Sequence, residues 1–223
     1  MIDTGVGGSA PLPELASVYW RSLADEDSLR RAARLWTIVT ASHTVPFVAV
    51  AVLLILLAPV TAPVALILLL HAWIIPELYA ARGANVLRAR VSSPDGAERI
   101  ARGLLGDLLD RRADAVHEQT GLVIERGYLG VWMVGEAGAV LIRPGGRRVH
   151  CFCVKATDQS LPASDRVAHL LLALREHEAG FATVANLAFC GARWRLHRRL
   201  ARNAQRALEI AASAARSEEP RKP

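Results

Sequence analysis

The distribution of charged and apolar positions sets one stretch of the chain apart from the rest. From Leu35 to Pro76 there are 42 residues without a single Asp, Glu, Lys or Arg. Beyond this span, charged residues and glycines alternate with short apolar runs. Because an apolar run of about 18 residues is already long enough for a transmembrane helix, the span has room for two.

The uncharged span divides at the sequence APVTAP, residues 58–63. Since proline interrupts a helix but suits its first turn, this sequence predicts the end of one helix and the start of another. One helix is expected from Leu35 to Leu57, about 34 Å long, and the other from Ala62 to Tyr79, about 27 Å long. We therefore predict an N-terminal two-helix transmembrane hairpin over residues 35–80.

Arginines predict how this hairpin is oriented. Three precede the first helix, three follow the second, and the connecting turn carries no charge. They are Arg30, Arg31, Arg34, Arg82, Arg88 and Arg90. Because basic residues favour the cytoplasmic side, both termini are expected in the cytoplasm and the hairpin in the inner (plasma) membrane. Pro46 keeps a re-entrant hairpin open as an alternative, because a break there would shorten the first helix.

Residues 1–34 are predicted to hold a disordered N-terminus followed by an amphipathic helix over 13–34. The acidic stretch from Asp25 to Asp27 is interpreted as a solvated face of that helix. Within the uncharged span, His43 and His71 are two ionisable side chains. A neutral imidazole is less costly to bury than a charge, so each is expected to bond a neighbouring helix or the carbonyl freed by the proline.

Residues 91–214 predict a cytoplasmic α+β domain, and residues 215–223 a charged tail. A helix with an apolar stripe is expected from Glu98 to Glu118, closed by Gly121. Four short apolar segments with glycine-containing turns follow and predict an antiparallel β-meander flanked by helices. The segments are 122–125, 129–134, 139–143 and 147–155.

The end of the domain is predicted as helix, strand and helix. Ser164 is expected to cap a helix that ends before Gly180. Residues 181–190 are almost wholly apolar, which is typical of a buried parallel strand, although their alanines also suit a helix. A long helix rich in Arg and Ala is expected over about 192–214.

Composition narrows the class of protein. The 223 residues carry 27 basic and 21 acidic side chains, a net charge of +6, and 52% of the residues are apolar. These values exclude a disordered chain and a disulfide-rich scaffold. Three cysteines form no pairing framework, which favours a reducing compartment. The abundance of Arg and Ala, which have GC-rich codons, favours a bacterial source.

The residues able to bind metals form no established pattern. Cys151 and Cys153 share one face of the last meander strand while His150 lies on the other, and Cys190 could join them only if its strand lies alongside. A zinc site needs four ligands. We therefore expect no metal, no cofactor and no catalytic residue, and buried cysteines that act as small hydrophobic side chains.

The order helix, three strands, helix, strand is similar to the core of the restriction-endonuclease-like fold. Ala97-Glu98 and the stretch Val134–Ile142 resemble the first helix and the hairpin of the nuclease-related domain family. By this resemblance, the family's metal-binding Asp would fall at Leu129 or Gly130, and its Asp/Glu-x-Lys at Arg143-Pro144-Gly145. Since these positions hold no carboxylate and no lysine, the resemblance implies the fold without the reaction.

The main candidate binding feature is an arginine-rich segment. Six arginines occur within fourteen residues that contain no acid, with leucines giving the helix an apolar side. They are Arg193, Arg195, Arg198, Arg199, Arg202 and Arg206. Three interpretations stay open: contact with anionic lipid at about 1 kcal/mol for each arginine, binding of nucleic-acid phosphates, and a solvated face.

Together these patterns predict an integral membrane protein that carries a non-enzymatic, membrane-tethered binding or scaffold module. The expected partners are the lipid bilayer, above all its anionic lipid, and a protein partner or second copy through the hairpin. The alternative is a membrane-anchored nuclease-like enzyme or a nucleic-acid-binding protein.

Overall fold

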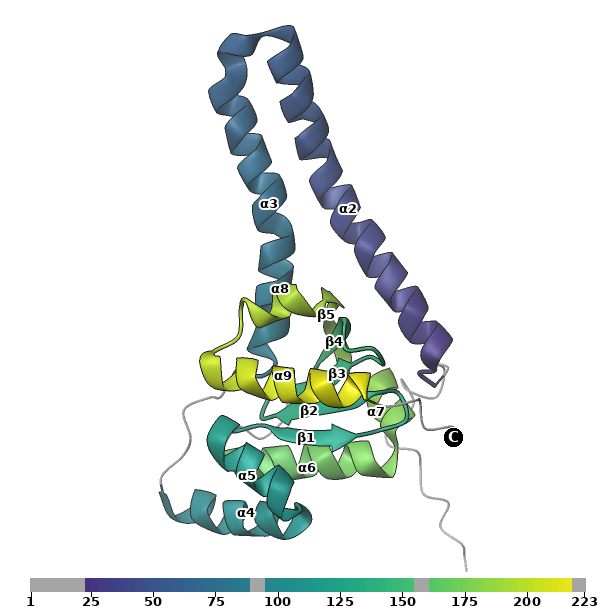
Figure 1. Cartoon of the computed structure of the whole chain (residues 1–223), viewed down its shortest axis with the longest axis vertical. Helices are drawn as coiled ribbons and strands as arrows, with labels where there is room; N and C mark the ends of the chain where they lie inside the picture. Colours follow the sequence, from purple (N-terminus) through teal and green to yellow (C-terminus); the bar gives the residue numbers. More distant parts are fainter. Residues whose placement is uncertain (1–22, 89–94, 155–160, 218–223) are drawn as a thin grey trace, which may run out of the picture.

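The computed structural model describes residues 23–88, 95–154 and 161–217. Two long helices, α2 (Glu26–Leu57) and α3 (Ala62–Asn85), are joined by the short 3-10 helix η1 (Pro59–Thr61). They form a hairpin that projects from the rest of the molecule (Figure 1). Both are long and apolar enough to cross a membrane, and only 6% of the most apolar window of α2 and 22% of that of α3 is buried. They are therefore not core helices of the domain.

The start of α2 differs from the sequence interpretation. The helix begins at Glu26, and the predicted amphipathic helix over 13–34 is wrong at residues 23–25, while residues 1–22 lie outside the described residues. Asp25 caps the helix: its carboxylate accepts a hydrogen bond from Ser28 N at 2.7 Å, and its own N–H donates to Ser28 Oγ at 2.9 Å. This reciprocal pair is a capping box. The helix then continues unbroken through Pro46.

The two hairpin histidines bond within their own helices, so the expected bonds to a neighbouring helix or to the carbonyl freed by Pro46 are wrong. Nδ1 of His43 and of His71 lies 2.6 and 2.9 Å from the carbonyl oxygen four residues earlier. Only their rings reach the opposite helix. His71 stacks on Phe47 with centroids 5.9 Å apart, and His43 meets Tyr79 at 6.3 Å.

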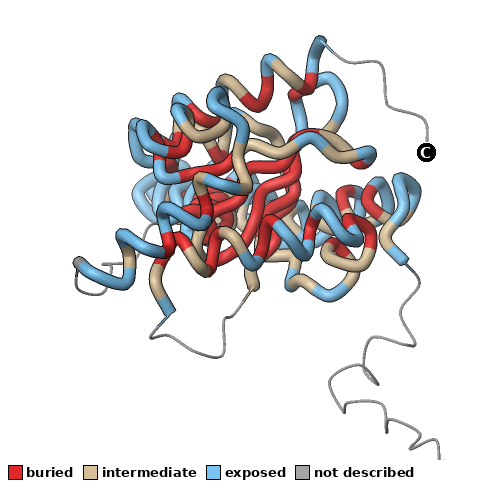
Figure 2. The backbone as a smooth tube through the Cα atoms, turned by 90° about the horizontal axis from the view of Figure 1, so that it is seen from below, coloured by how far each residue is buried: buried red, intermediate tan, exposed pale blue. Residues whose placement is uncertain are grey.

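The remaining residues form an α+β domain around a five-stranded antiparallel sheet with the strands in sequence order. The strands are β1 (Val123–Arg126), β2 (Val131–Gly135), β3 (Gly138–Ile142), β4 (Arg148–Cys153) and β5 (Asn186–Ala192). The first four confirm the predicted meander. β2 and β3 are buried along their whole length, at the centre of the domain (Figure 2).

Helices cover both faces of the sheet. Trp132 and Leu141 face a core formed with α4 (Asp95–Leu108), α6 (Ala163–Glu176) and α7 (Glu178–Val184). Met133 and Val140, which alternate with them, face a second core formed with α3 and α9 (Arg202–Arg216). This period-two alternation is what a sheet buried on both faces requires.

Two predicted helices are interrupted. The helix expected over Glu98–Glu118 ends at Leu108, and α5 (Arg111–Thr120) begins after Asp110, whose carboxylate accepts from the backbone N–H groups of two following residues at 2.9 and 2.7 Å. Gly121 ends α5 in the left-handed conformation, φ 71°, as predicted. The long helix over 192–214 is also two helices, α8 (Arg193–His197) and α9.

Two further expectations need correction. Ser164 lies inside α6 and does not cap it, because its N–H and hydroxyl are turned toward Glu98, where Oγ donates to Oε1 at 2.6 Å. Residues 181–190 are divided between α7 and β5. The strand is antiparallel to β4 and stands at the sheet edge, so the expected buried parallel strand is wrong.

The base of the hairpin lies against this edge strand. α2 and α3 diverge from the hairpin tip, and each contacts β5 (Figure 1). Phe189 is the centre of the contact: it is 2% exposed and meets Trp36 edge to face at 6.3 Å. On its other side lies Gly83, where an added Cβ would come 2.7 Å from Phe189 Cβ. Only glycine allows α3 to approach the strand this closely.

A buried carboxylate joins α7 to the turn between β1 and β2. Glu178 is 7% exposed and accepts three hydrogen bonds, from Tyr128 N at 2.7 Å, Leu129 N at 3.1 Å and Trp132 Nε1 at 2.5 Å. Glycine is required at position 127, because an added Cβ would overlap this carboxylate. One side chain therefore fixes the turn that precedes the central strand.

Glu178→Ala should lower the free energy of unfolding by about 1–3 kcal/mol, because it leaves buried N–H donors without an acceptor. Denaturant unfolding of the full chain in detergent, followed by tryptophan fluorescence, measures this. The matched control is Glu176→Ala, two residues earlier and exposed, which should stay within about 0.5 kcal/mol of wild type. Equal losses for the two variants would contradict the assigned role.

Candidate functional site at the base of the hairpin

The arginine-rich segment faces the sheet with its apolar side. Leu196 and Leu208 are fully buried and Leu200 is 7% exposed, all in the core beneath α9. Leu196 and Leu200 are therefore covered by the domain and present no apolar side to a membrane. An apolar stripe on a helix shows that the stripe is buried, but it does not distinguish a sheet from a membrane.

Glu77, the first carboxylate after the uncharged span, binds the end of α8 to α3. It is 5% exposed, and Arg199 donates to its Oε2 from Nε at 2.9 Å and from Nη2 at 2.6 Å. Arg198 Nη1 lies 4.0 Å from Oε1. A buried carboxylate needs such partners to offset its lost hydration. Arg199 is thus engaged in holding the hairpin to the domain.

Two of the other arginines of the segment accompany a tryptophan. The guanidinium carbons of Arg195 and Arg198 lie 5.2 and 5.9 Å from the centroid of Trp194. Trp194 is 53% exposed, and it lines the same cavity as Trp73, which is 56% exposed. Arg193 begins α8, while Arg202 and Arg206 lie on the exposed side of α9. The six arginines therefore do not form one site.

A second group of arginines lines a pocket of about 370 Å³ where the N-terminal part of α2 meets the turn between β3 and β4. The sequence alone does not reveal this group, because its members come from distant segments. They are Arg30, Arg34, Arg143, Arg147 and Arg148, with Glu26 as the one carboxylate of the lining. The feature of the sequence that could have indicated this pocket is the set of arginines on both sides of the glycine turn at 145–146.

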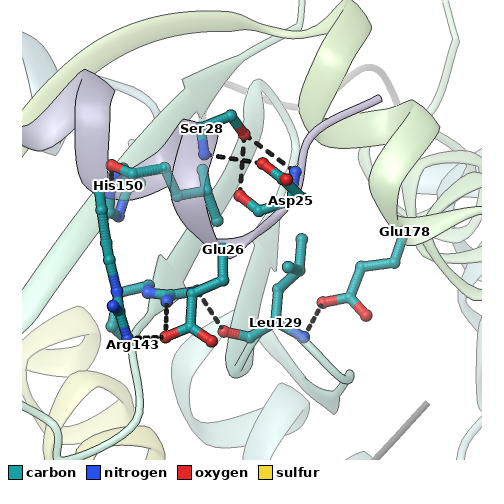
Figure 3. Close-up of polar contacts among 9 residues, drawn as sticks. Asp25, Glu26, Ser28, Leu129, Arg143, His150 and Glu178 are labelled. Atoms are coloured by element: carbon teal, nitrogen blue, oxygen red, sulfur yellow. Dashed lines mark hydrogen bonds and ion pairs between the residues drawn. The ribbon is translucent and has the colours of Figure 1, made fainter. Parts of the chain in front are cut away.

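Arg143 is the most buried arginine of this pocket (Figure 3). Its Nη2 lies 3.0 Å from Glu26 Oε1, and its Nη1 donates to the carbonyl of Leu129 at 2.9 Å. Burial lowers its pKa, and the neighbouring Glu26 carboxylate opposes that change. Arg147 and Arg148 are exposed and, among the described residues, form no ion pair.

His150 also lines this pocket, although it is 2% exposed (Figure 3). Its Nε2 lies 3.2 Å from the carbonyl oxygen of Leu29, and Nδ1 has no partner within the described part of the chain. Burial lowers its pKa to about 4, and the nearby Arg143 and Arg148 act in the same direction. The ring is therefore neutral at pH 7, with Nε2–H as the donor to Leu29.

This pKa predicts a loss of stability in acid. The folded-state value of about 4 lies below the ordinary 6.5, so the unfolded chain binds the proton more tightly. His150 then contributes up to about 3 kcal/mol to the free energy of unfolding. This contribution is present above pH 6.5 and is lost as the pH falls toward 4. The difference in unfolding free energy between wild type and His150→Gln should shrink over this range. Wild type and the exposed-site control His169→Gln should keep the same pH dependence.

The positions compared with nuclease ligands lie at this same edge of the domain, and the carboxylates beside them are already engaged: Glu178 accepts from Leu129 N and Glu26 pairs with Arg143. Glu98 bonds Ser164, and Glu136 pairs with Arg166 at 3.0 Å. Over the described residues there is no group of three or more His, Cys, Asp or Glu placed to hold a metal ion. The pocket that Arg143 lines holds five arginines and one carboxylate, so it is basic and suits an anion better than a cation.

The strand of Cys190 does lie alongside that of Cys151 and Cys153, which the sequence left open. Register pairs Cys190 with His150 and Cys151 with Phe189, and all three thiols are free. Burial raises the pKa of Cys190 to about 11 and also raises that of Cys151. Both are therefore protonated and poorly nucleophilic near neutral pH.

Comparison with protein-family models, with curated proteins and with solved structures finds no match to this chain.

Proposed function

We propose that this protein is an integral membrane protein of the inner (plasma) membrane, with both termini in the cytoplasm. Its α+β domain acts as a non-enzymatic module that binds anionic lipid at the membrane surface. The observation that supports this most directly is the kind of side chain found where the exposed apolar surface of the hairpin ends. There, the half-exposed Trp73 and Trp194 lie beside Arg148 and Arg195 in one cavity lining. Tryptophan and arginine are the side chains favoured at a membrane–water interface.

The charge at this level supports anionic lipid as the partner. The pocket between α2 and the β3–β4 turn holds five arginines against one carboxylate. Lipid phosphates supply the missing negative charge, and each arginine near the membrane surface contributes about 1 kcal/mol to such binding. Because the hairpin already holds the domain at the membrane, weak intrinsic affinity is enough.

The topology follows from the hairpin and can be tested with single cysteines. Val60→Cys, at the 87% exposed tip, should react with a membrane-impermeant maleimide added to intact cells. Gln119→Cys, exposed on α5, should react only after the cells are opened. Wild type, whose cysteines are buried or half-buried, is the blank. Labelling of position 119 in intact cells would contradict the orientation, and protection of position 60 would indicate a re-entrant hairpin.

Lipid binding should appear as a gain in thermal stability. Phosphatidylglycerol added to the full chain in neutral detergent should raise the Tm more than phosphatidylcholine does, because only the native state presents the clustered arginines. The double variant Arg147→Gln/Arg148→Gln should lose about 2 kcal/mol of this binding. Raised salt should reduce the gain, since exposed charges are screened.

The matched control for this measurement is Arg111→Gln/Arg112→Gln, an adjacent exposed pair on α5. α5 lies at the end of the domain away from the hairpin (Figure 1), so this variant should keep the wild-type response. An equal gain from both lipids, or an equal loss in both double variants, would contradict specific binding at the hairpin base.

A further inference from the structure

A cavity of about 620 Å³ lies between α2 and α3, above the base of the hairpin. The two helices form its sides, and Phe189 with the segment from β5 to α8 closes its lower end. The cavity exists because β5 stands between the bases of the diverging helices (Figure 1). Its volume lies within the range of about 300–1,000 Å³ that is usual for small-molecule sites.

The cavity is a groove between the two helices, and its upper walls offer little to a polar ligand. Thr37, Thr40 and Thr44 line it, but each Oγ1 donates its hydrogen to a carbonyl one turn earlier in α2, at 2.9, 2.8 and 3.1 Å. The rest of the upper lining is apolar, including Val48 and Leu69. With its hydroxyl donors already engaged, this part of the groove suits a hydrocarbon chain.

The length of the groove matches one leaflet of a bilayer. On α2 its lining runs from Trp36 to Val48, twelve residues apart, which corresponds to about 18 Å along the helix axis. Half of a hydrocarbon core of about 30 Å is about 15 Å. An acyl chain that entered beside Trp36 would therefore extend to about the middle of the bilayer, where the leaflet ends.

The lower end of the groove is positively charged. Arg148 and Arg195 are the charged residues of its lining, and both lie at the domain end. Arg148 is exposed and also lines the neighbouring basic pocket, while Arg195 is held over the ring of Trp194. Two cations beside an apolar groove complement a molecule with one anionic end and a long hydrocarbon tail.

We propose that this groove binds one anionic phospholipid from the cytoplasmic leaflet, with an acyl chain between α2 and α3 and the phosphate between Arg148 and Arg195. The inference rests on the proposed membrane span, but it goes further than surface attraction. It assigns a single lipid to a defined site, which persists when the bulk bilayer is removed.

The test is native mass spectrometry of the full chain, purified from membranes in neutral detergent. Wild type should retain one anionic phospholipid per chain. Ala41→Trp, whose side chain fills the groove, should lower this occupancy about tenfold. The matched control is Ile38→Trp, also on α2 but exposed outside the groove lining, which should retain lipid as wild type does. Arg148→Gln/Arg195→Gln should also lower occupancy about tenfold or more.

Equal lipid retention in wild type, Ala41→Trp and Ile38→Trp would overturn the assignment. A wild type that retains no lipid, yet still gains thermal stability from phosphatidylglycerol, would overturn the groove site and leave the proposed surface binding intact. Absence of both effects would defeat both proposals.

A second measurement covers the case in which Ala41→Trp does not fold. A photo-crosslinking amino acid in place of Thr40, activated in native membranes, should give an adduct with the mass of one phospholipid. A crosslinked product of twice the chain mass would instead place a second copy in the groove and overturn the lipid assignment.

Discussion

An edge strand leaves a row of backbone N–H and C=O groups without sheet partners, and proteins cover or blunt such edges. In this chain the base of the hairpin lies against that edge, β5, with Phe189 between Trp36 and Gly83. The contact has two consequences. It fixes the domain to the hairpin, and it keeps the bases of α2 and α3 apart so that a groove opens between them.

The same contact brings distant basic residues to one level of the molecule. Arg34 comes from α2, Arg148 from the start of β4 and Arg195 from α8, and they share the linings of two adjoining cavities. The pairing of Glu77 with Arg199 holds α8 beside α3. From the domain toward the hairpin tip, charged side chains are thus followed by aromatic rings and then by exposed apolar helix. A membrane surface has the matching order of water, headgroups and hydrocarbon.

The parts of this structure that could be predicted are those determined by residues close together in the sequence. The uncharged span gives the two long helices, the period-two runs give the meander, and Gly121 gives a helix end. The parts that were missed depend on residues far apart. The pairing of Glu178 with Trp132 and that of Arg143 with Glu26 follow from the fold alone. The sequence also could not show what the leucines of the arginine-rich segment contact, because they fit a sheet and a membrane equally well.

The central claim is that the hairpin and the domain are joined through β5, and hydrogen–deuterium exchange of the full chain in lipid nanodiscs tests it most directly. If the hairpin base excludes water from the sheet edge, backbone amides of 186–192 that donate to β4 should be protected nearly as well as those of β2 and β3. Exchange of this strand as fast as that of the exposed α4 surface would show that the edge is open, and would contradict the account.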